Sequence, residues 1–336
     1  MTSIKDVAEK ANVSIKTVSR ILGGFEGVSA KTKEKVTNAM KELDYAPSAA
    51  AQALRGVEAG IVSLITDNLT TTPDSYEIVA GIQNICDQHG KQLLIGEMAG
   101  KPENFERLVD DFKRHRSQAI ILATVFHKEV KIEQAFKNTP LILVNCFEQQ
   151  TLHPTIIPDD YQGGYDAAVH LINKGHTRIA ELRLFEDMKA SQLRHQGYKQ
   201  ALSDHQIAYD PTLIRIGVIE NESDEFAQLE QVLKDLLSLP NPPSALMCGN
   251  DKMAMRTYML VRGVMGYQIP QQISIVGYDN YRLISENLLP KLSTVSLPYF
   301  AMGQEAAKLA IAKIKQAKIH KISGQFVDRG SVATLL

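Results

Sequence analysis

Apolar residues recur at three- and four-residue spacing in three short segments at the start of the chain, a pattern typical of helices with one buried face. A serine suited to capping a helix precedes each segment, at Ser3, Ser14 and Ser29. The apolar positions are Val7, Ala8 and Ala11, then Val13, Val18, Ile21 and Leu22, then Val36, Ala39, Met40 and Leu43. The pattern predicts an all-α headpiece over residues 1–45 whose first two helices form a helix-turn-helix.

The start of the second helix lies outside this apolar pattern. It carries Ser14, Ile15, Lys16 and Thr17, with Arg20 one turn further on. The second helix of a helix-turn-helix enters the major groove of DNA with its N-terminus first. We predict that Lys16 and Arg20 hydrogen-bond to base edges while Ile15 makes an apolar contact. Ser14 and Thr17 are predicted to bind phosphates. The alternative is an ordinary helical hairpin.

An alanine-rich segment predicts a hinge helix and linker over residues 46–59. Pro47 suits a first helical turn, the alanines favour helix, and Gly56 ends it. A helix of about nine residues is too short to be stable alone. With Leu54 as its single large apolar residue, this helix needs a partner; the alternative is a plain linker helix.

From Gly60 onward, short apolar strands alternate with amphipathic helices, which is typical of parallel α/β units. The predicted strands are 61–66, 92–96, 119–123, 141–145, 178–183, 213–217, 245–249 and 273–279, while residues 294–298 and 325–332 are expected to return to the lobes and bridge them. We expect two similar lobes within residues 60–336. Lobe one takes about 60–160 and 292–318, and lobe two takes about 161–291 and 319–336.

Composition narrows the classes of function. The 336 residues are 44% hydrophobic and 22% charged, with a net charge of −1, so the chain as a whole is not a basic nucleic-acid binder. Residues 1–60 hold nine Lys and Arg against seven Asp and Glu, a local excess of two positive charges. Three distant cysteines without CxxC spacing favour neither disulfides nor a zinc site. We expect a cytoplasmic protein with no membrane segment, no cofactor and no metal, because apolar leader, phosphate-loop and metal motifs are absent from the sequence.

The motifs IKDVAEKANVS, TVSRIL and LDYAP, with the alanine-rich segment ending at Leu54, together resemble the headpiece of the lactose/galactose repressor family of bacterial transcription regulators. The resemblance extends over nearly the whole chain. It implies a two-lobed core similar to periplasmic binding proteins and a homodimer that binds double-stranded operator DNA. It also implies that paired hinge helices insert Leu54 into the minor groove, with Arg55 beside it.

Ligands of such sheets bind beyond the carboxyl ends of the strands, in the cleft that two lobes share. Arg194, Asn250 and Asp279 follow predicted strands, offer paired hydrogen bonds to hydroxyl groups, and match effector contacts of the resembled family. Each has a simpler role open to it: a helix cap for Asn250, a turn for Asp279 and a surface ion pair for Arg194. Further candidates for the same site are Asn145, Thr66, Asp67, Tyr76, Phe147 and Phe185.

The sequence departs from the family pattern near the cleft. Asn145-Cys146 replaces a frequent Asp-Arg, and Asp159-Asp160 replaces a frequent Asp-Asn. The loop Asn68–Pro73 also differs, so the identity of the ligand stays open. We predict a dimeric repressor controlled by a small carbohydrate-type effector. The alternative is a cytoplasmic sugar-binding protein or sugar-active enzyme whose helical N-terminus serves only assembly.

Overall fold

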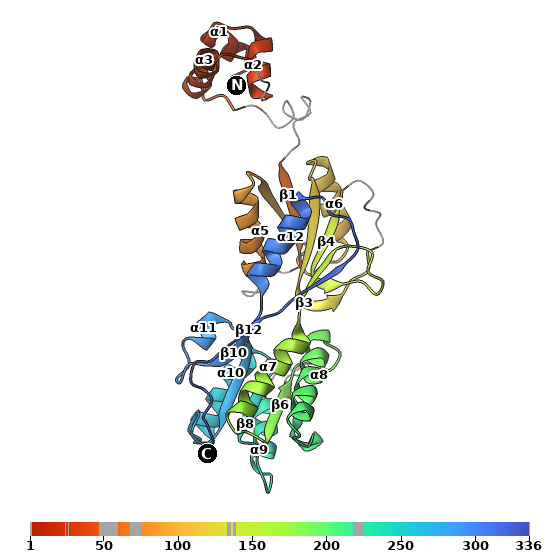
Figure 1. The fold of residues 1–336 in the computed structure, drawn as a ribbon, viewed down its shortest axis with the longest axis vertical. Coiled ribbons are helices and arrows are strands. Elements are labelled where there is room, and N and C mark those ends of the chain that lie inside the picture. The colour runs from red at the N-terminus through yellow and green to blue at the C-terminus, as the bar shows by residue number, and fades with distance from the viewer. Residues whose placement is uncertain are drawn as a thin grey trace.

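The computed structural model describes residues 2–23, 25, 27–46, 60–67, 76–132, 136, 139–217 and 225–335. Figure 1 shows a helical headpiece, lobe one and lobe two following one another along the long axis of the molecule. The predicted hinge helix, with Leu54 and Arg55, and the loop Asn68–Pro73 lie outside the described residues.

The headpiece consists of three helices, α1 (Ile4–Ala11), α2 (Ile15–Leu22) and α3 (Ala30–Glu42). The three predicted caps are confirmed: the Ser3, Ser14 and Ser29 side chains each accept a hydrogen bond from a backbone N–H three residues later. One small core joins the helices. Its buried members are Val7, Ala8, Ala11, Val18, Val36 and Ala39.

Lobe one is built on a sheet of six parallel strands in the order β11-β5-β4-β3-β1-β2. Their bounds are β1 Ile61–Thr66, β2 Gln92–Glu97, β3 Ala119–Glu129, β4 Leu141–Phe147, β5 Thr155–Pro158 and β11 Ile319–Ile322. Helices α5 (Tyr76–Gln88) and α12 (Tyr299–Ile311) pack on one face, and α6 (Asn104–Arg114) packs on the other. Side chains alternate between the two faces, so both faces of the sheet are buried.

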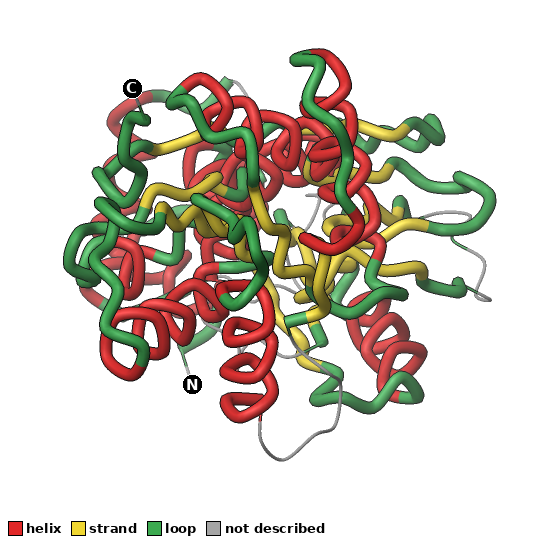
Figure 2. Tube along the Cα trace, turned by 90° about the horizontal axis from the view of Figure 1, so that it is seen from below, coloured by secondary structure: helices red, strands yellow, loops and turns green. Residues whose placement is uncertain are grey.

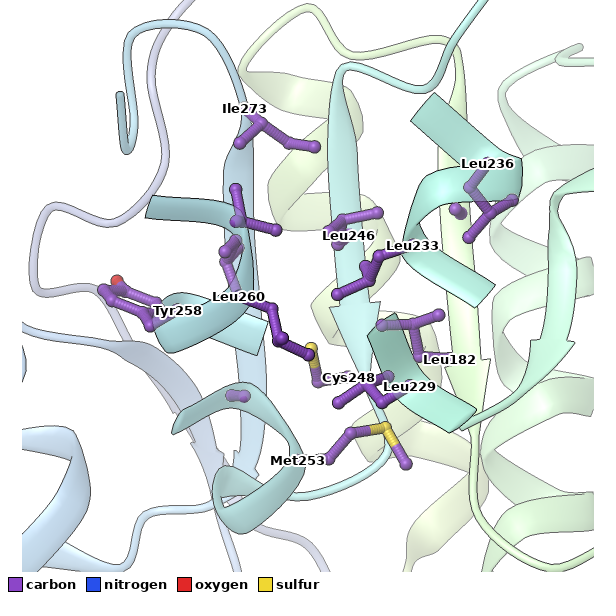
Figure 3. Packing of buried hydrophobic residues seen from close by; sticks show 14 of the residues in the cluster. Leu182, Leu229, Leu233, Leu236, Leu246, Cys248, Met253, Tyr258, Leu260 and Ile273 are labelled. Carbon is purple, nitrogen blue, oxygen red and sulfur yellow. The ribbon is translucent and has the colours of Figure 1, made fainter. Parts of the chain in front are cut away.

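Lobe two repeats this plan with strand order β12-β10-β9-β8-β6-β7, parallel except for β12. Its strands are β6 Ile179–Arg183, β7 Ile214–Ile216, β8 Ala245–Cys248, β9 Ser274–Asp279, β10 Ser293–Ser296 and β12 Gln325–Val327. Its helices are α7 Asp160–Asn173, α8 Lys189–Asp204, α9 Glu225–Leu237, α10 Asp251–Tyr258 and α11 Arg282–Ser285, with the short turns η2 Pro211–Leu213 and η3 Met259–Val264. Figure 3 shows the core under α9 and α10, where Leu229, Leu233 and Met253 face the strand residues Leu182 and Leu246. Figure 2 shows the strands in the interior with helices on the outer sides.

The chain crosses between the lobes three times. It passes from β5 into α7, returns after β10 to enter α12, and leaves lobe one again after β11. Strand β10 pairs with β9, and β11 pairs with β5. The second and third crossings therefore come after Ser296 and Ile322, a few residues later than the expected boundaries at 292 and 319.

Two further observations concern the chain as a whole. None of the described helices combines the length and apolarity needed to cross a membrane. Cys86, Cys146 and Cys248 are buried free thiols, as the sequence predicts, and burial raises the pKa of both Cys146 and Cys248 to about 12.

Candidate functional site

Helix α2 presents its N-terminal turn away from the headpiece core. The Oγ of Ser14 accepts a hydrogen bond from the Thr17 backbone N–H at 3.1 Å, which fixes where the helix begins. Val18 is fully buried, whereas Ile15 is 47% exposed and Lys16 and Arg20 are exposed. An exposed large aliphatic side chain next to two cations is available for contact with another molecule, and this is the geometry that major-groove recognition needs.

A cavity of about 350 Å³ lies between the two lobes, at the carboxyl ends of the strands. It brings together five of the predicted residues, namely Phe185, Arg194, Asn250 and Asp279 from lobe two and Asn145 from lobe one. Its walls therefore combine guanidinium, amide, carboxylate and aromatic groups. Such a wall forms directional hydrogen bonds to hydroxyl groups and packs on an apolar face.

Asn250 and Asp279 owe their positions to the ends of two neighbouring strands. Asn250 follows β8, and its Oδ1 accepts a hydrogen bond from the Met253 backbone N–H at 2.8 Å, so it caps α10 as well as lining the cavity. Asp279 ends β9 with a φ of 114°, a left-handed backbone conformation that few residues adopt. The helix cap that the sequence leaves open for Asn250 is thus confirmed, and the residue also lines the cavity.

Arg194 is held in place by three groups within lobe two. Its Nε donates to Oδ1 of Asp160 at 2.8 Å, its Nη1 donates to the Gly249 carbonyl at 2.7 Å, and its guanidinium lies 3.5 Å from the centre of the Tyr278 ring. Burial opposes its charge, but the negative charge of Asp160 outweighs burial and raises the pKa of Arg194. The ion pair is buried rather than on the surface, because Arg194 is only 7% exposed.

A close helix crossing sets the distance between Asp160 and Arg194. Helices α7 and α8 meet at Gly164 and Gly197, where a Cβ on Gly164 would lie 2.2 Å from the Arg194 carbonyl oxygen and a Cβ on Gly197 would lie 2.1 Å from the Tyr161 carbonyl oxygen. No side chain fits at either contact. The two glycines therefore let α8 approach α7 closely enough for its arginine to reach the acid of α7.

Sequence reasoning missed His127, Asp160, Lys252 and Arg256, which also line the cavity. Lys252 and Arg256 lie one turn apart on α10, a spacing that places both on one face of the helix. Asp160 follows the cap Asp159 and is visible in the sequence only as a departure from the family pattern. His127 lies on an extension of β3 beyond the predicted strand.

Four of the predicted ligand contacts do not line this cavity. They are Thr66, Asp67, Phe147 and Tyr76. Thr66 is buried at the end of β1, and Tyr76 is exposed at the start of α5 beside a small depression shared with α11. Asp67 lines a separate cavity of about 620 Å³ on lobe one.

Asp67, and also Asn145 from its place in the cavity wall, support the end of β3. Oδ1 of Asp67 accepts a hydrogen bond from the Val125 backbone N–H at 3.0 Å, and its Oδ2 accepts one from Lys128 at 2.8 Å. Nδ2 of Asn145 donates to the carbonyls of Thr124 and Val125, each at 3.0 Å. The pairing of β3 with β4 shifts register between Ala123 and Lys128, so the backbone there loses its regular partners and takes side-chain partners instead.

In the described part of the chain, no group of three or more His, Cys, Asp or Glu side chains is placed to hold a metal ion. The cavity wall combines charged, hydrogen-bonding and apolar side chains.

Comparison with known proteins covers both parts of the molecule. Residues 3–48 match the model of bacterial regulatory proteins of the lacI family, and residues 168–332 match that of the periplasmic binding protein-like domain. The chain is 31% identical to the HTH-type transcriptional regulator GalR of Escherichia coli (strain K12) over 339 residues, covering 99% of this chain and 96% of that protein. It is 29% identical to the HTH-type transcriptional repressor PurR of Vibrio atlanticus (strain LGP32) over 342 residues, covering all of both proteins.

Two solved structures are similar over nearly the whole chain. The lac repressor dimer bound to operator and the anti-inducer ONPF is 27% identical, with a TM-score of 0.81 over 99% of each chain. The complex of the transcriptional regulator CelR with cellobiose is 25% identical, with a TM-score of 0.66 over 98% of this chain and all of that chain.

Proposed function

The chain belongs to the lacI family of bacterial regulatory proteins and is a DNA-binding transcription regulator. From this premise we propose that it is a dimeric repressor, which binds operator DNA through α2 and is controlled by a small ligand between its lobes. The observation that carries the proposal is the presence, in one chain, of an exposed helix start on a small capped headpiece and a polar cleft between two α/β lobes. Because operator DNA lies in the bacterial cytoplasm, we propose that the protein acts there.

The DNA contact rests on α2. Lys16 and Arg20 bind base edges, Ile15 makes an apolar contact, and Ser14 and Thr17 bind phosphates. The lac repressor structure that resembles this chain over 99% of its length is a dimer bound to operator, which supports this mode of binding. In a dimer, two headpieces read a near-palindromic operator.

The effector is a sugar or sugar derivative. Arg194, Asn250 and Asp279 supply donors and acceptors within one cavity, and Phe185 supplies an apolar face. Regulators with related sequences support this class: one is named for the sucrose operon at 28% identity, and another was solved with cellobiose. A ligand controls the regulator when it binds two arrangements of the lobes with different affinity.

The dimer surface includes an apolar region of lobe two. Met259, Val264, Leu283 and Leu289 are between 53% and 73% exposed and lie on or near η3 and α11. Large exposed apolar side chains gathered in one region of a lobe mark an interface. Leu283→Glu is expected to shift the protein toward monomer in light scattering after size-exclusion chromatography. An unchanged mass would place the interface elsewhere.

The test of the DNA contact is a binding titration against DNA fragments selected from a random library. Arg20→Ala is expected to weaken the preference for the selected fragment by about 1 to 3 kcal/mol, the discrimination that one base contact supplies. Lys10→Ala is the matched control, because Lys10 is an exposed cation on α1 that pairs with Glu42. Leu54→Ala tests the predicted hinge contact. If neither Arg20→Ala nor Leu54→Ala weakens specific binding, the proposal is wrong.

The test of the effector is a thermal-shift screen with sugars, sugar phosphates, nucleosides and purines, since a ligand that binds the native state stabilises it. Asp279→Ala is expected to abolish the shift given by the best ligand. A sugar-binding protein or sugar-active enzyme would show the same shift but no sequence-specific DNA binding, so the two experiments together separate the two functions.

A further inference from the structure

His127 and Asp160 join the two lobes inside the cleft. Nδ1 of His127, at the end of β3 in lobe one, lies 2.9 Å from Oδ2 of Asp160, in the first turn of α7 in lobe two. Oδ1 of the same carboxylate accepts the hydrogen bond from Arg194 of α8. The exposed fractions of the three residues are 5%, 0% and 7%. One buried carboxylate therefore connects a side chain of lobe one to the arginine of lobe two.

The charge state of Asp160 fixes the direction of the bond. Burial alone would raise the pKa of Asp160, but the charge of Arg194 and the hydrogen bond from His127 outweigh burial and lower it. The carboxylate is therefore ionised at neutral pH. An ionised carboxylate can only accept hydrogen bonds, so Nδ1 of His127 is the donor.

The surroundings hold His127 in position. The Phe147 ring packs edge-on against the imidazole at 5.3 Å between ring centres. Asp67 and Asn145 hold the backbone of the β3 extension through Val125, two residues before the histidine. The residues that the sequence suggested as ligand contacts in lobe one thus support the wall that carries His127.

We propose that His127, Asp160 and Arg194 form an inter-lobe latch, which holds the lobes in the arrangement of this structure. The effector controls whether the hydrogen bond between His127 and Asp160 is formed or broken. The latch deepens the proposed function and rests on it for its role in regulation. All three residues line the cavity that receives the ligand, so a bound ligand contacts the bridging groups themselves.

The link between the lobes can be tested separately from the ion pair within lobe two, because the latch residues are divided between the lobes. Asp160 and Arg194 belong to lobe two, so a change at His127 removes the link between lobes and leaves the buried ion pair intact. His127→Leu removes the donor at similar bulk. His127→Asn places an amide Nδ2 near the position of the imidazole Nδ1 and keeps a donor. His127→Asn is the matched control.

The experiment measures the distance between one label on each lobe by double electron–electron resonance, without DNA or effector. The labels are attached at Arg107→Cys on α6 and Gln200→Cys on α8, both exposed positions, while the three native cysteines are buried. Excess unlabelled chain ensures that each dimer carries one labelled copy. Wild type and His127→Asn are expected to give the same narrow distribution, and His127→Leu a broader or displaced one.

Operator affinity without effector supplies the second measurement. His127→Leu is expected to change it by about fivefold or more, a typical size for coupling between sites, and His127→Asn is expected to leave it near the wild-type value. A His127→Leu distance distribution that superimposes on wild type overturns the latch. A His127→Asn distribution as broad as that of His127→Leu overturns the role of the donor. Loss of specific operator binding by wild type would overturn the proposed function instead, since the distance measurement involves no DNA.

Discussion

The two lobes share one fold plan but contribute to the cleft unequally. In the described residues, lobe two supplies Arg194, Asn250, Lys252, Arg256 and Asp279 to the cavity wall. Lobe one supplies a strand end and three polar side chains, His127, Asn145 and Tyr299. The Asn145 amide group and Asp67, which lies behind the wall, bond to the backbone of that strand end.

This difference suggests a division of roles. Lobe two carries most of the groups that recognise a ligand, on elements packed tightly by the glycine contact of α7 with α8. Lobe one presents a braced wall that contacts lobe two through the buried His127 hydrogen bond. Ligand recognition therefore depends mainly on lobe two. The structural response to the ligand depends on how lobe one is attached to lobe two. The following substitutions test this division, from the largest expected effect to the smallest.

Arg194→Met removes the central cation of lobe two. It leaves the Asp160 carboxylate buried with His127 as its remaining partner, and breaking a buried ion pair in this way costs about 3 to 5 kcal/mol. Urea unfolding at pH 7 measures the loss. Arg178→Met is the control in the same lobe, because Arg178 pairs with Asp210 near the surface and is expected to cost below about 1 kcal/mol. Equal losses in the two variants would contradict the prediction.

The pH dependence of Arg194→Met has a defined sign. In the wild type the pKa of Asp160 is lowered, so its contribution to stability is present above the unfolded value of 3.8 and is lost as pH falls through the lower folded value. Without the charge of Arg194, burial raises the folded pKa above the unfolded one. The deficit of the variant is therefore expected to shrink as pH falls from 7 toward 4.

Gly164→Ala and Gly81→Ala introduce the same kind of clash in different lobes. The added Cβ would lie 2.2 Å from the Arg194 carbonyl oxygen in lobe two and 2.1 Å from the Phe300 carbonyl oxygen in lobe one. Both are expected to lower stability by about 1 to 3 kcal/mol, as overpacking does. Only Gly164→Ala is expected to weaken ligand binding in the thermal-shift assay, because it displaces Arg194. Equal weakening by both would remove the distinction between the lobes.

Asn145→Asp tests the brace in lobe one. Aspartate keeps the shape and tolerates the φ of 57° at this position, but it cannot donate to the two carbonyls. We expect a stability loss of about 1 to 2 kcal/mol and faster hydrogen exchange of residues 124–128. Exchange at wild-type rates would show that the side chain does not hold β3.

Thr66→Val is expected to have the smallest effect. Thr66 is buried at the end of β1 and does not line the cavity, so ligand affinity should stay within about twofold of wild type. Isothermal titration with the best ligand of the screen measures it. A tenfold loss would return Thr66 to the set of ligand contacts and weaken the contrast between lobes.

The headpiece and the strand ends of lobe two were predictable because their signals are local. A serine cap bonds to a residue three positions away, and Asn250 and Asp279 follow directly from the ends of apolar runs. Strands β5 and β11 were not predicted, since four residues ending near a proline or among charges give too short a pattern.

His127 could not be predicted for a different reason. Its partner Asp160 is 33 residues away, and the two meet only because the chain crosses between lobes there and β3 continues past its register shift. Thr66, Asp67 and Phe147 carried the right residue types at the right strand ends, but Asp67 and Phe147 contact that same irregular segment. Sequence patterns locate the edge of a sheet more readily than they locate the side chains that face outward from it.

The three crossings have a consequence for how the protein is made. The core of lobe one includes Met302, Ala306 and Ala310 of α12, so residues that leave the ribosome near the end of synthesis complete a lobe that began near residue 60. Nearly all of lobe two is translated before α12 can complete the core of lobe one. The growing chain therefore holds the β1 to β5 sheet without its α12 cover while residues 159–298 are synthesised, and exposed apolar sheet surface of this kind is what chaperones bind.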